Sequence, residues 1–146
     1  MIYNGATYYF MKNLQGDVVG VYNSSGTLLG EYVYDAWGKL LNSVTNDVLK
    51  ANPFRYRGYY YDSETALYYL NSRYYDPEAG RFLNMDGLSY LEPMAFNGLN
   101  LYAYCGNDPV MYSDPSGNFA ISFFAGLAIS FVIGTTKRGR QFTKEK

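Results

Sequence analysis

The stretch that decides the fold is residues 59–76, which read YYYDSETALYYLNSRYYD. It holds two aromatic-rich segments that each end in a Tyr-Asp pair, with Asp62 and Asp76 at equivalent positions. Another such pair, Tyr34-Asp35, stands earlier in the chain. Short units of this kind cannot bury an apolar face alone and must stack on neighbouring units. The near-duplication therefore predicts part of a repetitive β-structure rather than a self-contained enzyme domain.

The residues before this stretch follow the same pattern of short strands and turns. Strands are predicted by β-prone runs at 7–11, 18–22, 27–34 and 39–44. Residues that favour turns separate these runs at 13–17, 23–26 and 35–38. A strand spacing of about ten residues favours an antiparallel meander over βαβ units.

The near-duplicate itself predicts two longer strands, at 54–61 and 67–75, joined by a turn at 62–65. Beyond Gly80 the sequence becomes irregular, with Pro93, Pro109 and Pro115 interrupting it. Proline removes a ladder hydrogen bond, so regular strands are not expected there.

The composition excludes several classes of function. The net charge of -1 gives no electrostatic reason to expect nucleic acid as a partner. Histidine is absent, which excludes His-based catalytic triads and His zinc sites. The single cysteine, Cys105, cannot form an internal disulfide and is expected to be a small buried apolar residue. No cofactor and no metal are expected.

The last part of the chain changes character. Residues 115–136 carry no charge, and a basic cluster follows at Lys137-Arg138-Gly139-Arg140. The apolar run from Phe119 to Thr136 predicts a helix of about 27 Å, close to the ~30 Å of a hydrocarbon core. One interpretation is a membrane span or insertion with the basic cluster on its cytoplasmic flank. The other is a helix buried in a parent protein or inside an enclosing shell.

Four motifs in order resemble the RHS repeat-associated core. They are GYYYD at 58–62, LYYLNSRYYDPEAGRF at 67–82, GLNLYAYCGNDP at 98–109 and YSDPSG at 112–117. The strands upstream resemble ordinary YD repeats, so the similarity covers about residues 7–118. The implied organisation is YD-repeat strands at 1–52, the core at 53–118, and an apolar segment with a basic tail at 119–146.

The resemblance implies a mainly β fold, in which antiparallel YD-repeat hairpins form part of a β-shell and a short apolar C-terminal helix follows. In this family the shell encloses a variable C-terminal passenger, often a toxin. Partners are therefore expected to be the remaining repeats of a longer chain or neighbouring gene, together with that passenger. The expected location is secreted or on the cell surface, as part of a longer parent of which this chain is a fragment or an orphan piece.

The resemblance also implies a catalytic site. In many members the core closes one end of the shell and acts as an aspartyl autoprotease that cuts its own chain once, after the Asp-Pro-x-Gly motif. The matching positions are Arg73, Asp86 and Asp114. The corresponding cut falls between Asn118 and Phe119.

Such a site has a clear chemical logic. Two carboxyl groups held close together divide into an acid and a base, which can activate water at an adjacent peptide. Arg73 can orient one of them through a paired hydrogen bond. Because the substrate is tethered, its effective concentration is high. We therefore expect Asp86 and Asp114 within hydrogen-bonding reach or a water's width of each other, with Arg73 beside one of them.

Two departures from the family pattern leave alternatives open. Asn118 stands where the family usually has leucine, and the segment from Asp86 to Asp114 is longer than usual. Both aspartates could instead cap turns, as Asp before Pro or Gly commonly does; Asp76 and Asp108 are expected to do so. The functional alternatives are a non-catalytic structural or cell-surface YD module and a piece tethered to a membrane.

Overall fold

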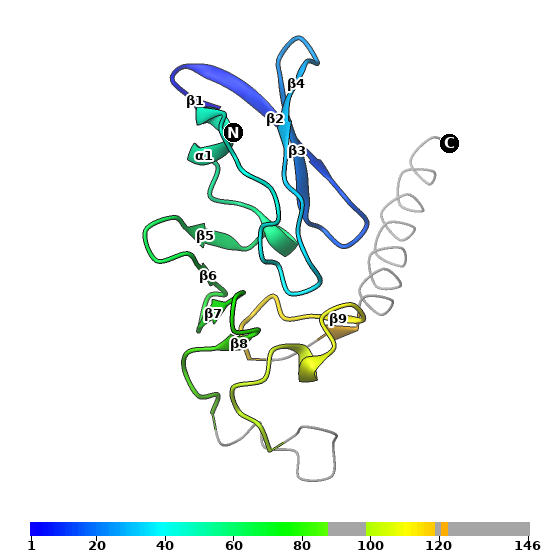
Figure 1. Cartoon of the computed structure of the whole chain (residues 1–146), viewed down its shortest axis with the longest axis vertical. Coiled ribbons are helices and arrows are strands. Elements are labelled where there is room, and N and C mark those ends of the chain that lie inside the picture. Colours follow the sequence, from blue (N-terminus) through cyan, green and yellow to red (C-terminus); the bar gives the residue numbers. More distant parts are fainter. Residues whose placement is uncertain (88–98, 119–120, 123–146) are drawn as a thin grey trace, which may run out of the picture.

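The computed structural model describes residues 1–87, 99–118 and 121–122, and these are mainly antiparallel β-structure. This confirms the predicted fold class. The first sheet has the order β1 (Ile2–Tyr3), β2 (Ala6–Lys12), β3 (Val18–Asn23) and β4 (Leu28–Glu31). The second has the order β5 (Tyr60–Asp62), β6 (Leu67–Tyr69), β7 (Tyr74–Asp76) and β8 (Arg81–Phe82). In Figure 1 the first sheet lies above the second, and the chain around residues 102–103 runs beside β8.

Three turns of the first half, at 13–17, 23–26 and 35–38, share one design. The side chains of Asn13, Asn23 and Asp35 each accept hydrogen bonds from the N–H groups two and four residues further on. The fourth residue of each turn is a glycine with positive φ, namely Gly16 at 91°, Gly26 at 81° and Gly38 at 86°. The acceptor closes the loop and the glycine tolerates the left-handed backbone, so the predicted turns at these three places are confirmed.

The strand expected at 39–44 does not form. Within it, Leu40 bridges Tyr34, and the N–H of Leu41 donates to the carbonyl of Val33 at 2.7 Å. The next contacts come from a side chain: the Asn42 amide accepts from the N–H of Val33 and donates to the carbonyl of Glu31. A side-chain amide thus replaces the backbone ladder that a strand would make.

The strand expected at 54–61 is also interrupted. A 3-10 helix, η1 (Tyr56–Gly58), occupies its middle, and β5 begins only at Tyr60. Arg57 has a φ of 53°, and its N–H donates at 2.8 Å to the buried carboxylate of Asp17, which lies in the turn between β2 and β3. The chain therefore bends to satisfy a buried acceptor in another part of the fold.

The run at 67–75 breaks into two strands, β6 and β7. Asn71 takes a φ of 62°, and the N–H of Leu70 donates to the carbonyl of Arg73 at 3.0 Å, which closes a tight turn. Asparagine is among the residues that tolerate this left-handed backbone. The turn allows Arg73 to point into the molecule, where it forms the site described below.

One short helix, α1 (Asp47–Ala51), lies in the polar stretch where no element was predicted. The side chain of Asn46 caps it by accepting from the N–H of Val48 at 2.9 Å. Leu49 is buried on its inner side, packed closely against Gly30 of β4. Together with Val18, Val21 and Tyr32, Leu49 forms a small core beneath the first sheet.

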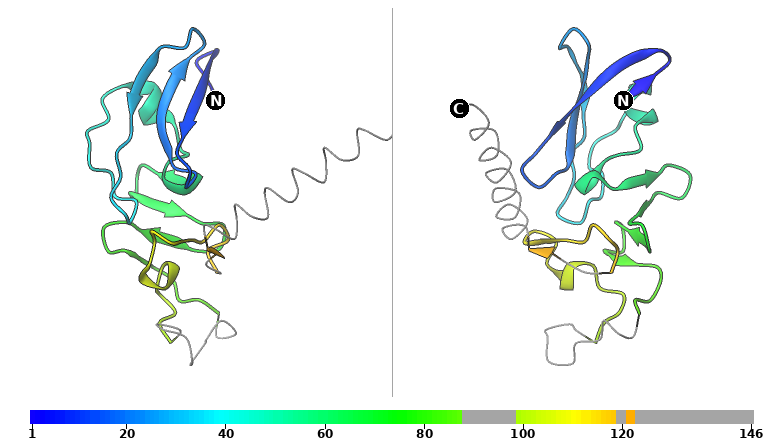
Figure 2. Two further views of the ribbon diagram at one scale, coloured as in Figure 1. Left: turned by 90° about the vertical axis from the view of Figure 1, so that its right-hand side faces the viewer. Right: turned by 180° about the vertical axis from the view of Figure 1, so that it is seen from behind.

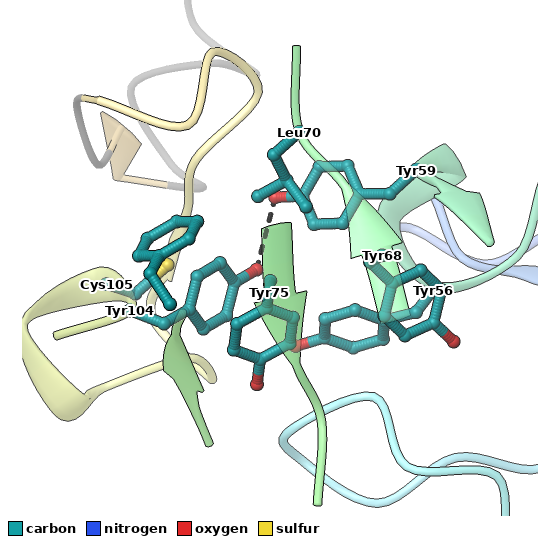
Figure 3. Packing of buried hydrophobic residues seen from close by; sticks show 8 residues of the cluster. Tyr56, Tyr59, Tyr68, Leu70, Tyr75, Tyr104 and Cys105 are labelled. Atoms are coloured by element: carbon teal, nitrogen blue, oxygen red, sulfur yellow. Dashed lines mark hydrogen bonds between the residues drawn. The ribbon is translucent and has the colours of Figure 1, made fainter. Parts of the chain in front are cut away.

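The larger core lies between the second sheet and residues 104–105 and consists mostly of tyrosine. Figure 3 shows its rings packed edge to face and tilted, with the hydroxyls of Tyr59 and Tyr104 joined by a hydrogen bond of 3.1 Å. Its buried members are Tyr56, Tyr59, Tyr68, Leu70, Tyr75, Phe82, Tyr104 and Cys105. Cys105 begins the 3-10 helix η3 (Cys105–Asn107) and is buried, as predicted.

Tyrosine hydroxyls of this core hold the turn at 35–38 in place. Tyr56, Tyr75 and Tyr68 donate to three successive carbonyls, those of residues 36, 37 and 38, at 2.8, 2.7 and 3.0 Å. Figure 2 shows from two further sides how this turn reaches down from the first sheet to the second. Buried hydroxyls need partners, and here the carbonyls of the turn supply them.

The C-terminal helix expected from Phe119 to Thr136 is wrong at its start. Ile121–Ser122 form strand β10, which pairs antiparallel with β9 (Tyr112–Ser113). The rest of that range lies outside the described residues. Across 1–87, 99–118 and 121–122, no helix reaches the length and apolar character of a membrane span.

Candidate active site

Arg73 links the two aspartates that the sequence singled out. Its Nη2 lies 2.9 Å from Oδ2 of Asp86 and 3.6 Å from Oδ2 of Asp114. All three residues are buried, with 5%, 7% and 2% of their surface exposed. The structure thus brings the three positions together, with one guanidinium nitrogen in contact with both carboxylates.

Backbone segments far apart in sequence hold the Arg73 guanidinium. Nη1 donates to the carbonyl of Leu101 at 2.9 Å, and Nε donates to the carbonyl of Gly117. The guanidinium plane lies over the Phe82 ring, with Cζ 3.6 Å from the ring centroid. Burial lowers the pKa of Arg73, an effect that the charges of Asp86 and Asp114 oppose.

Asp114 begins a turn that is built like those at Asn13, Asn23 and Asp35. Its Oδ1 accepts from the N–H groups of Ser116, Gly117 and Asn118 at 3.3, 2.8 and 3.2 Å. Gly117 is the fourth residue of this turn and has a φ of 78°. One carboxylate oxygen of Asp114 therefore organises the loop while the other faces Arg73.

Asp86 follows β8 and is fixed against the chain segment that runs beside that strand. Its N–H donates to the carbonyl of Leu101 at 3.0 Å, and its Oδ1 accepts from the N–H of Gly87 at 2.8 Å. The same Leu101 carbonyl also accepts from Arg73. One backbone carbonyl thus sets the position of both partners of the closer ion pair.

Asn118 brings the predicted cleavage position to this cluster. In the amide orientation that its neighbours favour, Nδ2 of Asn118 donates to Oδ1 of Asp86 at 3.2 Å and to Oγ of Ser72 at 3.1 Å. Phe119, on the other side of the expected cut, lies outside the described residues. The side chain of Asn118 is therefore in direct contact with one of the two candidate carboxylates.

A buried tyrosine pair supports the Asp114 loop from the core side. The N–H of Asp114 donates to the hydroxyl of Tyr59 at 3.0 Å, and that hydroxyl also pairs with Tyr104. Burial raises the pKa of both tyrosines, so they remain neutral. Burial also raises the pKa of the neighbouring Cys105 thiol to about 12, which keeps it a thiol rather than a nucleophilic thiolate.

Asp76 and Asp108 stand outside the cluster, and both cap turns. Oδ1 of Asp76 accepts from the N–H groups of Glu78 and Ala79, and Oδ1 of Asp108 accepts from that of Met111. Both had been predicted as turn residues. No group of three His, Cys, Asp or Glu side chains that could hold a metal occurs among the residues that the structure describes.

Sequence reasoning missed the residues that surround the aspartates. Tyr59 holds the Asp114 backbone, Leu101 supplies the shared carbonyl, and Ser72 contacts Asn118. The Asn-Ser pair directly before Arg73 was the available signal, because two short polar side chains interrupt an otherwise aromatic run. Nothing in the sequence marks Leu101, which acts only through its backbone.

The comparisons with known proteins agree with the fold. The Teneurin YD-shell family matches residues 1–110. A tRNA3(Ser)-specific nuclease WapA from Bacillus spizizenii is 44% identical over 116 residues, which are 80% of this chain and 5% of that protein. Toxin protein Tse5 from Pseudomonas aeruginosa is 45% identical over 67 residues, 46% of this chain and 5% of that protein.

Among solved structures, a Photorhabdus luminescens Tc holotoxin pore superposes with a TM-score of 0.70 and 31% identity. The match covers 82% of this chain and 5% of that one. The chain is thus a YD-shell domain and belongs to the Teneurin YD-shell family, which confirms the resemblance to RHS and YD-repeat proteins. It is related to bacterial toxins and spans about 5% of the length of these relatives.

Proposed function

We propose that this chain is the self-cleaving end of an RHS-type β-shell, with Asp86 and Asp114 as the catalytic pair and Arg73 as their common partner. The cut lies between Asn118 and Phe119 and separates the shell from the segment that follows. The observation that carries the proposal is the Arg73 guanidinium in contact with both buried carboxylates, next to the side chain of Asn118.

The charges of the cluster suit aspartyl hydrolysis. That chemistry needs one carboxyl group with a proton and one without. Arg73 supplies one positive charge, so the buried group of three has no net charge when one proton is shared by Asp86 and Asp114. The unprotonated carboxylate takes a proton from water as it attacks the Asn118 carbonyl, and the protonated one gives its proton to the leaving nitrogen of Phe119.

The wider role follows from the relatives. A shell domain of this kind needs the remaining repeats of a longer chain to pair its sheet edges. The named relatives include nucleases and a toxin, so the segment released after Asn118 is proposed to lead into such a passenger, outside the cell or at its surface. The chain itself is not proposed to bind nucleic acid or to cross a membrane.

A specific observation favours a second candidate, a purely structural shell module. Oδ1 of Asp114 already accepts three backbone hydrogen bonds of its own loop, which is a complete turn-capping role. Arg73 would then serve only to neutralise two buried carboxylates and to join segments separated by 28 and 44 residues. In this reading the chain closes the shell without cleaving it.

Intact mass spectrometry of the purified full chain during incubation separates the two candidates. Self-cleavage should convert it into fragments 1–118 and 119–146. Asp114→Asn keeps the Oδ1 acceptor and the shape of the turn but removes the ionisable group, so it should slow cleavage at least about 10²-fold. Asp86→Asn should do the same.

The matched control is Asp76→Asn, because Asp76 caps a turn outside the cluster. This variant should cleave at the wild-type rate. A folded wild-type chain that stays intact, or an Asp114→Asn variant that cleaves normally, would leave the structural module as the surviving candidate.

A further inference from the structure

Three consecutive residues of the loop between β6 and β7 hold three consecutive carbonyls of the Asp114 loop. Nδ2 of Asn71 donates to the carbonyl of Pro115 at 3.0 Å. Oγ of Ser72 donates to the carbonyl of Ser116 at 2.8 Å, and Nε of Arg73 donates to the carbonyl of Gly117. Side chains of the first loop thus pair residue by residue with carbonyls of the second, and position 118 is the next residue after the paired ones.

The two backbones approach too closely for any side chain at position 117. A Cβ added to Gly117 would lie 2.4 Å from the carbonyl oxygen of Leu70 and 2.6 Å from Oγ of Ser72. Gly117 also has a φ of 78°, which L side chains rarely adopt. Only glycine at this place lets the three donors reach their carbonyls.

At the next residue, Asn118, the contact is made by the side chain and not by the backbone carbonyl. Oγ of Ser72 already donates its proton to Ser116, so its lone pair is available to accept from Nδ2 of Asn118 at 3.1 Å. Oδ1 of Asp86 accepts from the same nitrogen at 3.2 Å. The carbonyl of the neighbouring Gly117 also lies 3.2 Å from this nitrogen, so the amide donor faces three acceptors, of which Ser72 and Asp86 come from two other segments.

We propose that Asn71, Ser72 and Arg73 form a substrate clamp, and that Ser72 together with Asp86 selects an amide side chain at position 118. This inference rests on the proposed self-cleavage and adds a specificity to it. Ser72 is a positioning residue, because it acts on the segment to be cut and on Asn118 rather than on the reacting atoms. A leucine at 118 offers no donor, which would leave the buried Asp86 oxygen without this partner.

A double-mutant cycle on cleavage tests the selection. Ser72→Ala should slow cleavage about threefold to tenfold, the range for one or two hydrogen bonds near the surface. Asn118→Leu should slow it by at least as much. In the Ser72→Ala background Asn118→Leu should slow cleavage about threefold less than it does in the wild type, because the Asn118 amide has already lost its Ser72 partner. Effects that simply multiply, or faster cleavage with Asn118→Leu, would overturn the proposal.

A second measurement does not depend on cleavage. In the Asp114→Asn background, hydrogen–deuterium exchange of the amides of residues 116–118 should rise about threefold or more with Ser72→Ala. Asn71→Gly should also raise it, since glycine accepts the positive φ of 62° and removes only the amide donor. Ser63→Ala, in the turn between β5 and β6, is the matched control and should change nothing.

The two readouts separate the two proposals. Suppose that no chain cleaves, but that Ser72→Ala and Asn118→Leu each raise the amide exchange of residues 116–118, with a combined effect smaller than the product of the two. The clamp then stands and the protease fails. If cleavage proceeds and neither variant changes its rate or the exchange, the protease stands and the clamp fails.

Discussion

Arg73 contacts more segments of the site than either aspartate does. A guanidinium has five N–H donors in a fixed plane, and this one contacts two carboxylates and two carbonyls. A lysine ammonium is a compact charge and cannot reach four acceptors spread around a plane. The identity of the residue, and not only its charge, therefore decides whether the four segments meet.

Arg73→Lys should lower the free energy of unfolding by about 2–4 kcal/mol, because buried acceptors lose their donors while the charge is retained. Arg73→Met should lower it by about 3–5 kcal/mol, because two buried carboxylates then have no cation. Urea denaturation followed by circular dichroism measures both. Arg81→Lys, at an exposed position on β8, should change stability by less than about 0.5 kcal/mol. Equal effects at positions 73 and 81 would contradict this account.

At the scale of elements, one turn design serves two purposes. The turn at Asp35 presents its carbonyls to tyrosine hydroxyls of the core, while the turn at Asp114 presents its carbonyls to Asn71, Ser72 and Arg73. In both, an aspartate oxygen collects the inner N–H groups and a glycine takes a positive φ. The candidate site is thus a repeat turn placed against an arginine and a second carboxylate.

The glycines of these turns should differ in tolerance according to what they face. Gly26→Ala should destabilise by about 1–2 kcal/mol, because only its φ is unfavourable and nothing lies within 4 Å of the new Cβ. Gly38→Ala should destabilise by about 2–5 kcal/mol, because its Cβ would also lie 2.5 Å from Cδ1 of Tyr56. Urea titration of the two variants gives the comparison. Equal losses would show that turn conformation alone matters and that the Tyr56 contact does not.

The sequence predicted the elements that depend on local chemistry. The runs that became β2, β3 and β6 and the three turns of the first half rest on β-propensity and turn residues, which are local. The two breaks that it missed in the second half depend on distant partners: Arg57 bends toward Asp17, and Asn71 turns the chain so that Arg73 can face inward. For the site, family motifs pointed to the aspartates, but side chains such as Ser72 became visible only through their contacts.

At the scale of the whole molecule, the site is a product of completed folding. Its members come from the β6–β7 loop, the end of β8, the chain beside β8 and the Asp114 loop, which meet only when the second sheet and the tyrosine core are formed. Separate pieces would hold the aspartates without their common arginine. Any cleavage at Asn118 should therefore follow folding rather than precede it.

The tyrosine core makes the stability of the whole chain sensitive to alkali. Burial raises the pKa of Tyr56, Tyr59, Tyr68, Tyr75 and Tyr104 above the ordinary value of 10.0, and that of Cys105 from 9.0 to about 12. Below about pH 8 these groups keep their protons in both the folded and the unfolded state, so their ionisation does not lower the stability. Above it the unfolded chain releases protons that the folded chain retains, so stability falls as pH rises.

Each such group contributes a slope of about 1.4 kcal/mol per pH unit once its unfolded form ionises. Several together should unfold the chain cooperatively above pH 10, with phenolate absorbance and loss of the β-sheet signal rising together. Tyr104→Phe removes one of these hydroxyls, so its slope of unfolding free energy against pH should be smaller by about 1.4 kcal/mol per pH unit. Complete phenolate formation while the sheet signal stays native would show that the core hydroxyls are open to solvent.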